Sequence, residues 1–375
     1  MTITNRIDDA PTEAPTRSAP PSGTETLSAP GHAPAGYAPQ VVIDSMRGVF
    51  LARALYAASA LGIPDRLVAG PRRCTELADE LGLQPRPLHQ VLRAIAGTGL
   101  LRTVPGPDTG PAQQFELTPL GEALRADHPS GTRDLILTMQ GPSIQSSLTV
   151  LAQRLASTRT GPELALGSPF FDHLAKNPGE ALAFDRMMVA IHGAESEAVA
   201  AEYDFSWART IVDVGGGVGG FLCSLLRRHE QLTGIVADLP EVADRARQHL
   251  VEQGMAHRCG AVGADFFERV PSGADAYLLS YVLHNWDDES CVAILRTCAA
   301  AMTEHSRLLV VEAVLPADDS PHPGKLLDLV MVALTRGVER ERREYAQLAE
   351  RAGLRLVDVI PTGSPVSVLE MELAR

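Results

Sequence analysis

The stretch Ile211–Gly220 (IVDVGGGVGG) is an apolar run that ends abruptly in glycines. The apolar segment after it, from Phe221 to Leu226, completes the pattern of a buried strand, a tight turn and a helix. Glycine lets the backbone approach a ligand closely and take φ values that other residues resist. The stretch therefore predicts a ligand-binding turn, although a glycine-rich turn alone does not identify the ligand.

Strands and helices alternate from residue 208 onward, which is typical of a parallel α/β sheet. The predicted strands are 211–214, 233–237, 259–262, 276–279 and 307–312. Two further strands, 356–360 and 366–371, are joined by a connection so short that they must be antiparallel. We predict that residues 201–375 form a Rossmann-like domain whose parallel sheet ends in an antiparallel hairpin.

Residues 41–128 have the pattern of a winged-helix domain. The predicted helices are 41–61, 64–68, 75–82 and 88–96, and strands 100–104 and 115–118 form a small hairpin. The helix pair carries Arg86 and Arg93, but its first helix is acidic, with Glu76, Asp79 and Glu80. This charge balance argues against DNA binding and favours a dimerisation or lid domain.

The remaining segments differ in composition. Residues 1–40 are rich in proline, alanine, threonine and serine, which predicts a disordered tail. Residues 129–200 are mostly helical in pattern, with predicted helices at 135–139, 148–156 and 181–203. We interpret this region as a helical linker that lines the substrate.

Composition restricts the class of protein. The chain has 375 residues and a net charge of −13, which argues against nucleic-acid or membrane partners. It has no apolar run of the ~20 residues that a membrane span needs, and its N-terminus does not resemble a signal peptide. The five cysteines form no C-x-x-C pair, so we expect free thiols in a reducing cytoplasm.

The glycine spacing fits two classes of cofactor. Gly215, Gly217 and Gly220 match G-x-G-x-x-G, and Asp238 follows at the end of the next strand, which is the fingerprint of an NAD-linked oxidoreductase. Asp238 could accept hydrogen bonds from the ribose of any nucleoside. Asp213, two residues before the first glycine, would repel a pyrophosphate but suits the cationic end of S-adenosylmethionine (SAM).

Further candidates follow the next strands. Asp265 and Phe266 could bind an adenine, or could form a plain capping loop. His284 lies just beyond the strand at 276–279, where ligands bind in open α/β sheets. Asp287 and Asp288 look like metal ligands but are better interpreted as a helix cap, so we predict no metal.

Two glutamates could serve His284. Glu312 ends the strand at 307–312, on the same edge of the sheet as His284, and could hold the second imidazole nitrogen. Glu339 is a second candidate, although the charged run from Glu339 to Glu344 also has the pattern of a solvated helix start.

These motifs together resemble the SAM-dependent O-methyltransferases of the caffeate, hydroxyneurosporene and bacterial polyketide type. The resemblance covers the chain from about residue 42 to the end. It is carried by VDVGGGVG at 212–219, DLP at 238–240, GADFF at 263–267, LHNWDD at 283–288 and GVER at 337–340, with FDRMM at 184–188 in the linker. Residues 61–65, 76–78 and 117–121 resemble the dimerisation domain of that family.

The resemblance implies a role for each matching residue. SAM, which leaves as S-adenosylhomocysteine, would contact Asp213, Gly215, Gly217, Asp238, Leu239, Asp265, Phe266 and Ser280. His284 would be the general base, bracketed by Glu312 and Glu339, and Met188 would line the substrate. The family commonly has an acid directly after the base, where this chain has Asn285. A homodimer with a small aromatic substrate is also implied.

Three functions therefore remain open from the sequence. An O-methyltransferase that methylates a phenolic hydroxyl, with His284 as base, explains every motif together. An NAD-dependent oxidoreductase explains only the glycines and Asp238, and a transcription regulator with a vestigial cofactor domain explains only the N-terminal region. A member of the family with diverged chemistry, such as hydroxylation, is a further alternative, and the acceptor cannot be identified.

Overall fold

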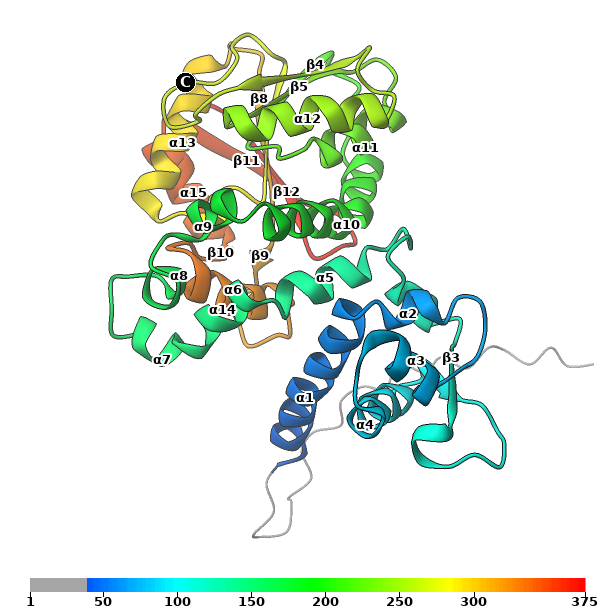
Figure 1. The fold of residues 1–375 in the computed structure, drawn as a ribbon. Helices are drawn as coiled ribbons and strands as arrows, with labels where there is room; N and C mark the ends of the chain where they lie inside the picture. The colour runs from blue at the N-terminus through cyan, green and yellow to red at the C-terminus, as the bar shows by residue number, and fades with distance from the viewer. Residues whose placement is uncertain (1–38, 375) are drawn as a thin grey trace, which may run out of the picture. The chain divides into compact units, whose positions relative to one another are not determined.

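The computed structural model describes residues 39–374 (Figure 1). The predicted tail lies outside the described residues except at its end, where Gln40 already begins helix α1 (Gln40–Ala60). Among residues 39–374 no helix is both long and apolar enough to cross a membrane.

The C-terminal region is built on a seven-stranded sheet with the order β11-β12-β8-β7-β4-β5-β6. Its parallel strands are β4 (Thr210–Val214), β5 (Thr233–Asp238), β6 (Cys259–Gly263), β7 (Ala276–Ser280) and β8 (Arg307–Glu312). The predicted hairpin, β11 (Leu354–Pro361) and β12 (Ser367–Leu373), is antiparallel and pairs with β8 through β12. The chain leaves β4 toward β5 on one side and returns to β7 on the other, so the switch point of the sheet lies beside β4.

Helices cover both faces of this sheet (Figure 1). Alternate strand residues pack against α13 (Asp288–Ala301) and α15 (Arg342–Arg351) on one face. The other strand residues pack against α10 (Pro178–Glu202), α11 (Gly220–Arg228) and α12 (Pro240–Glu252). Burial of both faces explains why β4 and β7 read as continuous apolar runs rather than as alternating patterns.

The N-terminal region has the predicted winged-helix elements. Helices α2 (Ile63–Arg66), α3 (Cys74–Leu81) and α4 (Pro85–Ala96) enclose a core with the hairpin of β2 (Leu101–Thr103) and β3 (Gln114–Leu117). Gly82 ends α3 with a φ of 66°, the left-handed conformation that favours glycine there. The sequence did not indicate β1 (Arg72–Arg73), which extends the hairpin to three strands.

The linker is helical, as predicted, but more finely divided. Its elements are α5 (Thr132–Met139), α6 (Pro142–Thr149), α7 (Leu151–Arg154), α8 (Gly161–Ala165), α9 (Phe170–Lys176) and the long α10. Outside the linker, short 3-10 helices lie at Gly110–Ala112 and Gly121–Leu124 in the N-terminal region and at Leu283–Asn285 in the C-terminal region.

Two features beyond the main sheet were not predicted. Helix α14 (Gly324–Leu334) follows β8, and a two-residue parallel ladder pairs β9 (Val314–Leu315) with β10 (Arg340–Glu341). The ladder sets Arg340 opposite Val314, so the chain around residue 339 lies beside the end of β8. This pairing brings two segments distant in sequence to one site.

Candidate active site

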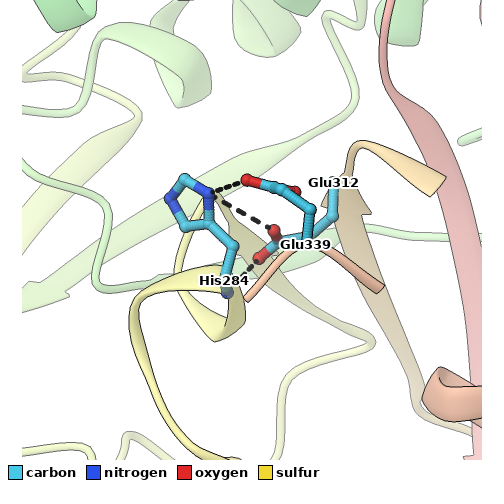
Figure 2. A group of neighbouring side chains, drawn as sticks. All are labelled: His284, Glu312 and Glu339. Carbon is cyan, nitrogen blue, oxygen red and sulfur yellow. Dashed lines mark hydrogen bonds and ion pairs between the residues drawn. The ribbon is translucent and has the colours of Figure 1, made fainter. Parts of the chain in front are cut away.

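His284 lies in the 3-10 turn after β7 and is 5% exposed. Its Nδ1 lies 2.7 Å from Oε1 of Glu339 and 4.0 Å from Oε2 of Glu312 (Figure 2). The second ring nitrogen, Nε2, points away from both carboxylates in Figure 2. A carboxylate at Nδ1 favours the tautomer that carries its proton there, which leaves Nε2 able to accept a proton.

The two glutamates divide their roles differently from the prediction. The sequence favoured Glu312 as the partner of the imidazole, but Nδ1 of His284 donates its hydrogen bond to Glu339. Oε1 of Glu312 instead accepts the backbone N–H groups of Leu283, at 2.8 Å, and His284, at 3.3 Å. Glu312 thus holds the backbone of the turn, whereas Glu339 orients the ring.

The alternative interpretation of Glu339, a solvated helix start, is wrong for that residue. Its side chain is fully buried, and its backbone N–H donates to Asp328 Oδ1 at 2.9 Å. The helix begins later: Glu341 and Glu344 form a capping box at the start of α15. The charged run is therefore split between a buried site and a helix cap.

Burial and charge act in opposite directions on His284. Burial alone would lower the pKa of His284, but the charge of Glu312 and the hydrogen bond to Glu339 together raise it above its ordinary value. Burial raises the pKa of Glu312 to about 7, and the nearby charge of Glu339 raises it too, while His284 opposes this. The two carboxylates thus stabilise the protonated imidazole and make the neutral imidazole a stronger base.

Arg340 belongs to the GVER motif, but the sequence alone assigned it no role. Its side chain is 1% exposed, and it donates to the carbonyl oxygens of Leu283, at 3.2 Å, and Trp286, at 2.9 Å. It also pairs with Asp288 at 2.8 Å. These contacts fix both ends of the turn that carries His284.

Gly337 packs directly on the same turn. A Cβ atom at this position would overlap the carbonyl oxygen of His284 and lie 2.5 Å from the carbonyl carbon of Asn285. Close backbone approach therefore requires glycine here. Asn285 in turn donates from Nδ2 to the carbonyl oxygen of Tyr281 at 3.0 Å, a bond that an ionised carboxylate could not make.

The glycine turn forms a second part of the site at the end of β4. Gly215 and Gly217 have φ values of 70° and 57°. Asp213 beneath them is 1% exposed, and neither of its carboxylate oxygens has a hydrogen-bond partner among the described residues. Burial, with a further contribution from Asp238, raises the pKa of Asp213 to about 7. A buried, unpaired carboxyl is costly and is suited to a cationic ligand.

Asp238 lies at the end of β5 and faces the glycine turn. Its Oδ2 accepts the N–H of Gly217 at 2.9 Å, and its Oδ1 accepts the N–H of Leu239 at 2.7 Å. Burial raises its pKa, and these two backbone hydrogen bonds oppose that shift. Asp213 and Asp238 are therefore both brought to the predicted turn.

An aromatic group lies next to this turn. A Cβ atom at Gly215 would meet the ring of Phe266 at 3.4 Å, and the Phe267 and Trp286 rings lie 4.8 Å apart. Asp265 is exposed and caps the N–H of Phe267 at 2.9 Å, as its alternative interpretation predicts, which does not exclude a ligand.

The two remaining predicted site residues lie on β7 and α10. Ser280 Oγ is buried at the end of β7 without a partner among the described residues. Met188 is half-buried on α10, and its role stays a prediction.

The helix cap predicted for the LHNWDD motif is confirmed. The side chain of Asp287 accepts a hydrogen bond from the N–H of Ser290 at the start of α13, and Asp288 forms an ion pair with Arg340. A different group could hold a metal: one atom each from His284, Glu312 and Glu339 lie within 4.8 Å of one another. A cation at His284 Nδ1 would have to displace the bond to Glu339, whereas Oε2 of Glu312 and Oε2 of Glu339 are buried without a partner among the described residues.

Comparison with known proteins identifies the family. A family model of an O-methyltransferase domain matches residues 150–355, and one of an O-methyltransferase dimerisation domain matches residues 43–127. The chain is 36% identical over 331 residues to phenazine O-methyltransferase PhzM of Lysobacter antibioticus, which covers 88% of this chain and 95% of the relative. The chain belongs to the O-methyltransferase family.

Solved structures agree with this assignment. The O-methyltransferase NcsB1 of neocarzinostatin biosynthesis, solved with SAM and 2-hydroxy-5-methyl naphthoic acid, is similar with a TM-score of 0.76 and 33% identity, over 90% of this chain and 100% of that one. The predicted resemblance is confirmed, and an O-methyltransferase is supported rather than an NAD oxidoreductase or a regulator. Sequence similarity alone does not fix the chemistry, because aclacinomycin 10-hydroxylase RdmB of Streptomyces purpurascens is 34% identical over 86% of both chains.

Proposed function

We propose that this O-methyltransferase transfers the methyl group of SAM to a hydroxyl, most simply a phenolic one, of a small aromatic metabolite, with His284 as general base. The observation that carries the proposal is the 2.7 Å bond between His284 Nδ1 and Glu339, which leaves Nε2 directed away from the carboxylates (Figure 2). A base needs this combination of a fixed ring and an available nitrogen.

The residues present fit SAM. The unpaired oxygens of Asp213 and the unpaired hydroxyl of Ser280 lie at the carboxyl ends of adjacent strands, β4 and β7. They suit the amino-acid end of the donor, and Asp238 and Phe266 suit its nucleoside end. When bound, SAM supplies an electrophilic methyl group on a sulfonium.

The base acts during displacement rather than before it. A phenol has a pKa of about 10 and an ordinary histidine one of about 6.5, so prior deprotonation is uphill by about 5 kcal/mol. The charge of Glu312 and the bond to Glu339 raise the pKa of His284 and reduce this mismatch. Glu339 also stabilises the imidazolium formed as Nε2 takes the proton.

Ligand binding and product formation test the proposal together. Thermal shift should show stabilisation by SAM and by S-adenosylhomocysteine but not by NAD, because only a ligand of the folded state raises its stability. A panel of hydroxynaphthoic acids, hydroxyphenazines and simple phenols should then give S-adenosylhomocysteine release with an O-methylated product. Stabilisation by NAD alone, or a hydroxylated product without methyl transfer, would refute it.

The pH profile follows from the raised pKa of His284. The base is active when neutral, so kcat/KM should rise with pH through a midpoint above the ordinary histidine value of 6.5. Glu312→Gln removes the charge that contributes most to raising this pKa, so its midpoint should move to lower pH. An unchanged midpoint, measured across pH 5–9 with saturating SAM, would argue that another group limits the reaction.

Asp213→Asn should separate binding from stability. The buried carboxylate has a raised pKa, so its burial costs stability as pH rises above the ordinary aspartate value and in full above about 7. We therefore expect the variant without ligand to melt at a higher temperature at pH 8, with a smaller gain at pH 5. Calorimetry should show SAM binding at least about tenfold weaker, the loss of one charge-assisted contact. Equal SAM affinity would exclude Asp213 from the donor site.

Removal of divalent cations should leave activity unchanged. Nδ1 of His284 already donates to Glu339, so a cation at this nitrogen would have to displace that bond, although Oε2 of Glu312 and Oε2 of Glu339 have no partner among the described residues. Initial rates before and after dialysis against EDTA test this. Loss of activity that Mg²⁺ or Zn²⁺ restores would show that the cluster, or another site, holds a metal.

A homodimer in the cytoplasm completes the proposal. Val49 and Phe50 of α1 are adjacent, apolar and 55% and 75% exposed, and an apolar patch of this kind supports a partner subunit over this helix. All five cysteines are buried and free, as expected in a reducing compartment.

A further inference from the structure

Tyr281 has a backbone conformation that calls for an explanation. Its φ is +53°, and it is the one residue other than glycine with a positive φ in the described part of the chain. The left-handed region is unfavourable for a bulky side chain and persists only where surrounding contacts enforce it. Tyr281 lies three residues before His284, at the start of the turn that carries the base.

Contacts from three directions enforce this conformation. The N–H of Tyr281 donates to the carbonyl oxygen of Val311 at 3.1 Å, which ties it to β8. Its own carbonyl oxygen accepts Nδ2 of Asn285 at 3.0 Å. Its phenolic O–H donates at 3.0 Å to Oε1 of Glu195, a buried residue of α10.

The enforced conformation directs the tyrosine ring onto the base. The rings of Tyr281 and His284 meet edge to face, with centroids 5.2 Å apart and an interplanar angle of 66°. Glu339 holds His284 through Nδ1, so the two contacts restrain different parts of the imidazole. The aromatic contact therefore adds to the restraint that Glu339 places on the imidazole.

We propose that Tyr281 and Asn285 are positioning residues that fix the orientation of the His284 ring. This proposal rests on the function proposed above, in which His284 is the base. Asn285 maintains the left-handed backbone, and that backbone places the Tyr281 ring against the imidazole. Misplacement of a base by about 1 Å can cost two orders of magnitude in rate, so small contacts of this kind matter.

The variants separate the ring, the hydroxyl and the backbone contact. Tyr281→Leu removes the ring and the hydroxyl, Tyr281→Phe removes only the hydroxyl, and Asn285→Leu removes the amide donor without adding charge. Tyr277→Phe is the matched control for a buried phenol, since Tyr277 donates to the Ala301 carbonyl at 2.8 Å. Gln231→Leu is the matched control for the amide, since Gln231 lies outside the linker and its Nε2 donates to the carbonyl oxygen of Phe205 at 3.3 Å.

Kinetics with SAM and 1,4-dihydroxy-2-naphthoic acid give the first readout. Tyr281→Leu and Asn285→Leu should lower kcat about tenfold or more with the KM for SAM unchanged, whereas Tyr281→Phe should retain activity to within about threefold. Both controls should keep the wild-type kcat. Wild-type kcat in Tyr281→Leu and Asn285→Leu, or an equal loss in the controls, would overturn the proposal.

Carbon-13 NMR of the histidine Cε1–H groups gives a second readout that needs no acceptor. The His284 signal is assigned by its loss in His284→Gln, and it should move in Tyr281→Leu and Asn285→Leu but not in the two controls. An unmoved signal would overturn the proposal even if the naphthoate is not turned over. Full activity of His284→Ala would instead refute the base assignment, so the two failures are distinguishable.

Discussion

His284→Ala should lower kcat about 10²–10⁴-fold, the usual contribution of a positioned general base. The residue is buried, and its Nδ1 is held by Glu339. We therefore expect no neighbouring side chain to take its place as the base. SAM binding should be unchanged, because the predicted donor contacts lie at Asp213, Asp238 and Ser280 instead. Steady-state kinetics with S-adenosylhomocysteine release, together with calorimetry for SAM, measure both effects.

His305→Ala is the matched control for this substitution. His305 has a side chain that is 88% exposed and lies outside the site, so its loss should change neither kcat nor SAM affinity. His284→Gln tests whether shape alone suffices, since glutamine fills similar space but cannot accept the proton at neutral pH. Turnover of His284→Ala within a few-fold of wild type would show that positioning alone drives the reaction.

Arg340→Ala should cost about 2–5 kcal/mol of stability, because two backbone carbonyls lose their donor at about 1–3 kcal/mol each, while the 60% exposed Asp288 contributes little. The substitution leaves the carbonyl oxygens of Leu283 and Trp286 without their donor and releases Asp288. The thermal midpoint should fall by roughly 2–4 °C for each kcal/mol lost, and activity should fall with it because the turn carrying His284 loosens. Thermal denaturation at one fixed scan rate measures the change.

Arg336→Ala is the control for the loss of an arginine. Its side chain is 60% exposed and lies 3.6 Å from Glu163, so we expect a change of less than about 1 kcal/mol. Arg340→Lys should fall between the two, because lysine keeps the charge but cannot serve several acceptors with one planar fork. If Arg340→Ala melted at the wild-type temperature, the turn would be held by other contacts.

Features with a local signal could be predicted from the sequence. The strand and glycine turn at 211–220, the hairpin of β11 and β12, and the Asp287 cap each depend on neighbouring residues or on repeating apolar spacing. The positions of Asp213, Asp238 and His284 follow from the same rule, because all three lie at the carboxyl ends of parallel strands.

Features that depend on contacts between distant segments could not be predicted. The ladder of β9 and β10 is two residues long and has no periodic pattern, yet it brings Glu339 to His284. For the same reason Glu312 appeared to be the better partner of the imidazole. The need for glycine at 337 and the buried state of Arg340 arise from packing on the His284 turn, which the GVER motif containing both residues does not reveal by itself.

Methyl transfer from carbon-13-labelled SAM is the most direct test of the central claim, that His284 serves a SAM site as the base for an aromatic hydroxyl. Wild-type protein and His284→Ala are incubated with the panel of hydroxynaphthoic acids, hydroxyphenazines and simple phenols, and the labelled methyl group is located by NMR. The account predicts label on a phenolic oxygen with wild type, and a rate at least about 100-fold lower with the variant. Label on carbon or nitrogen alone, or equal O-methylation by both proteins, would contradict it.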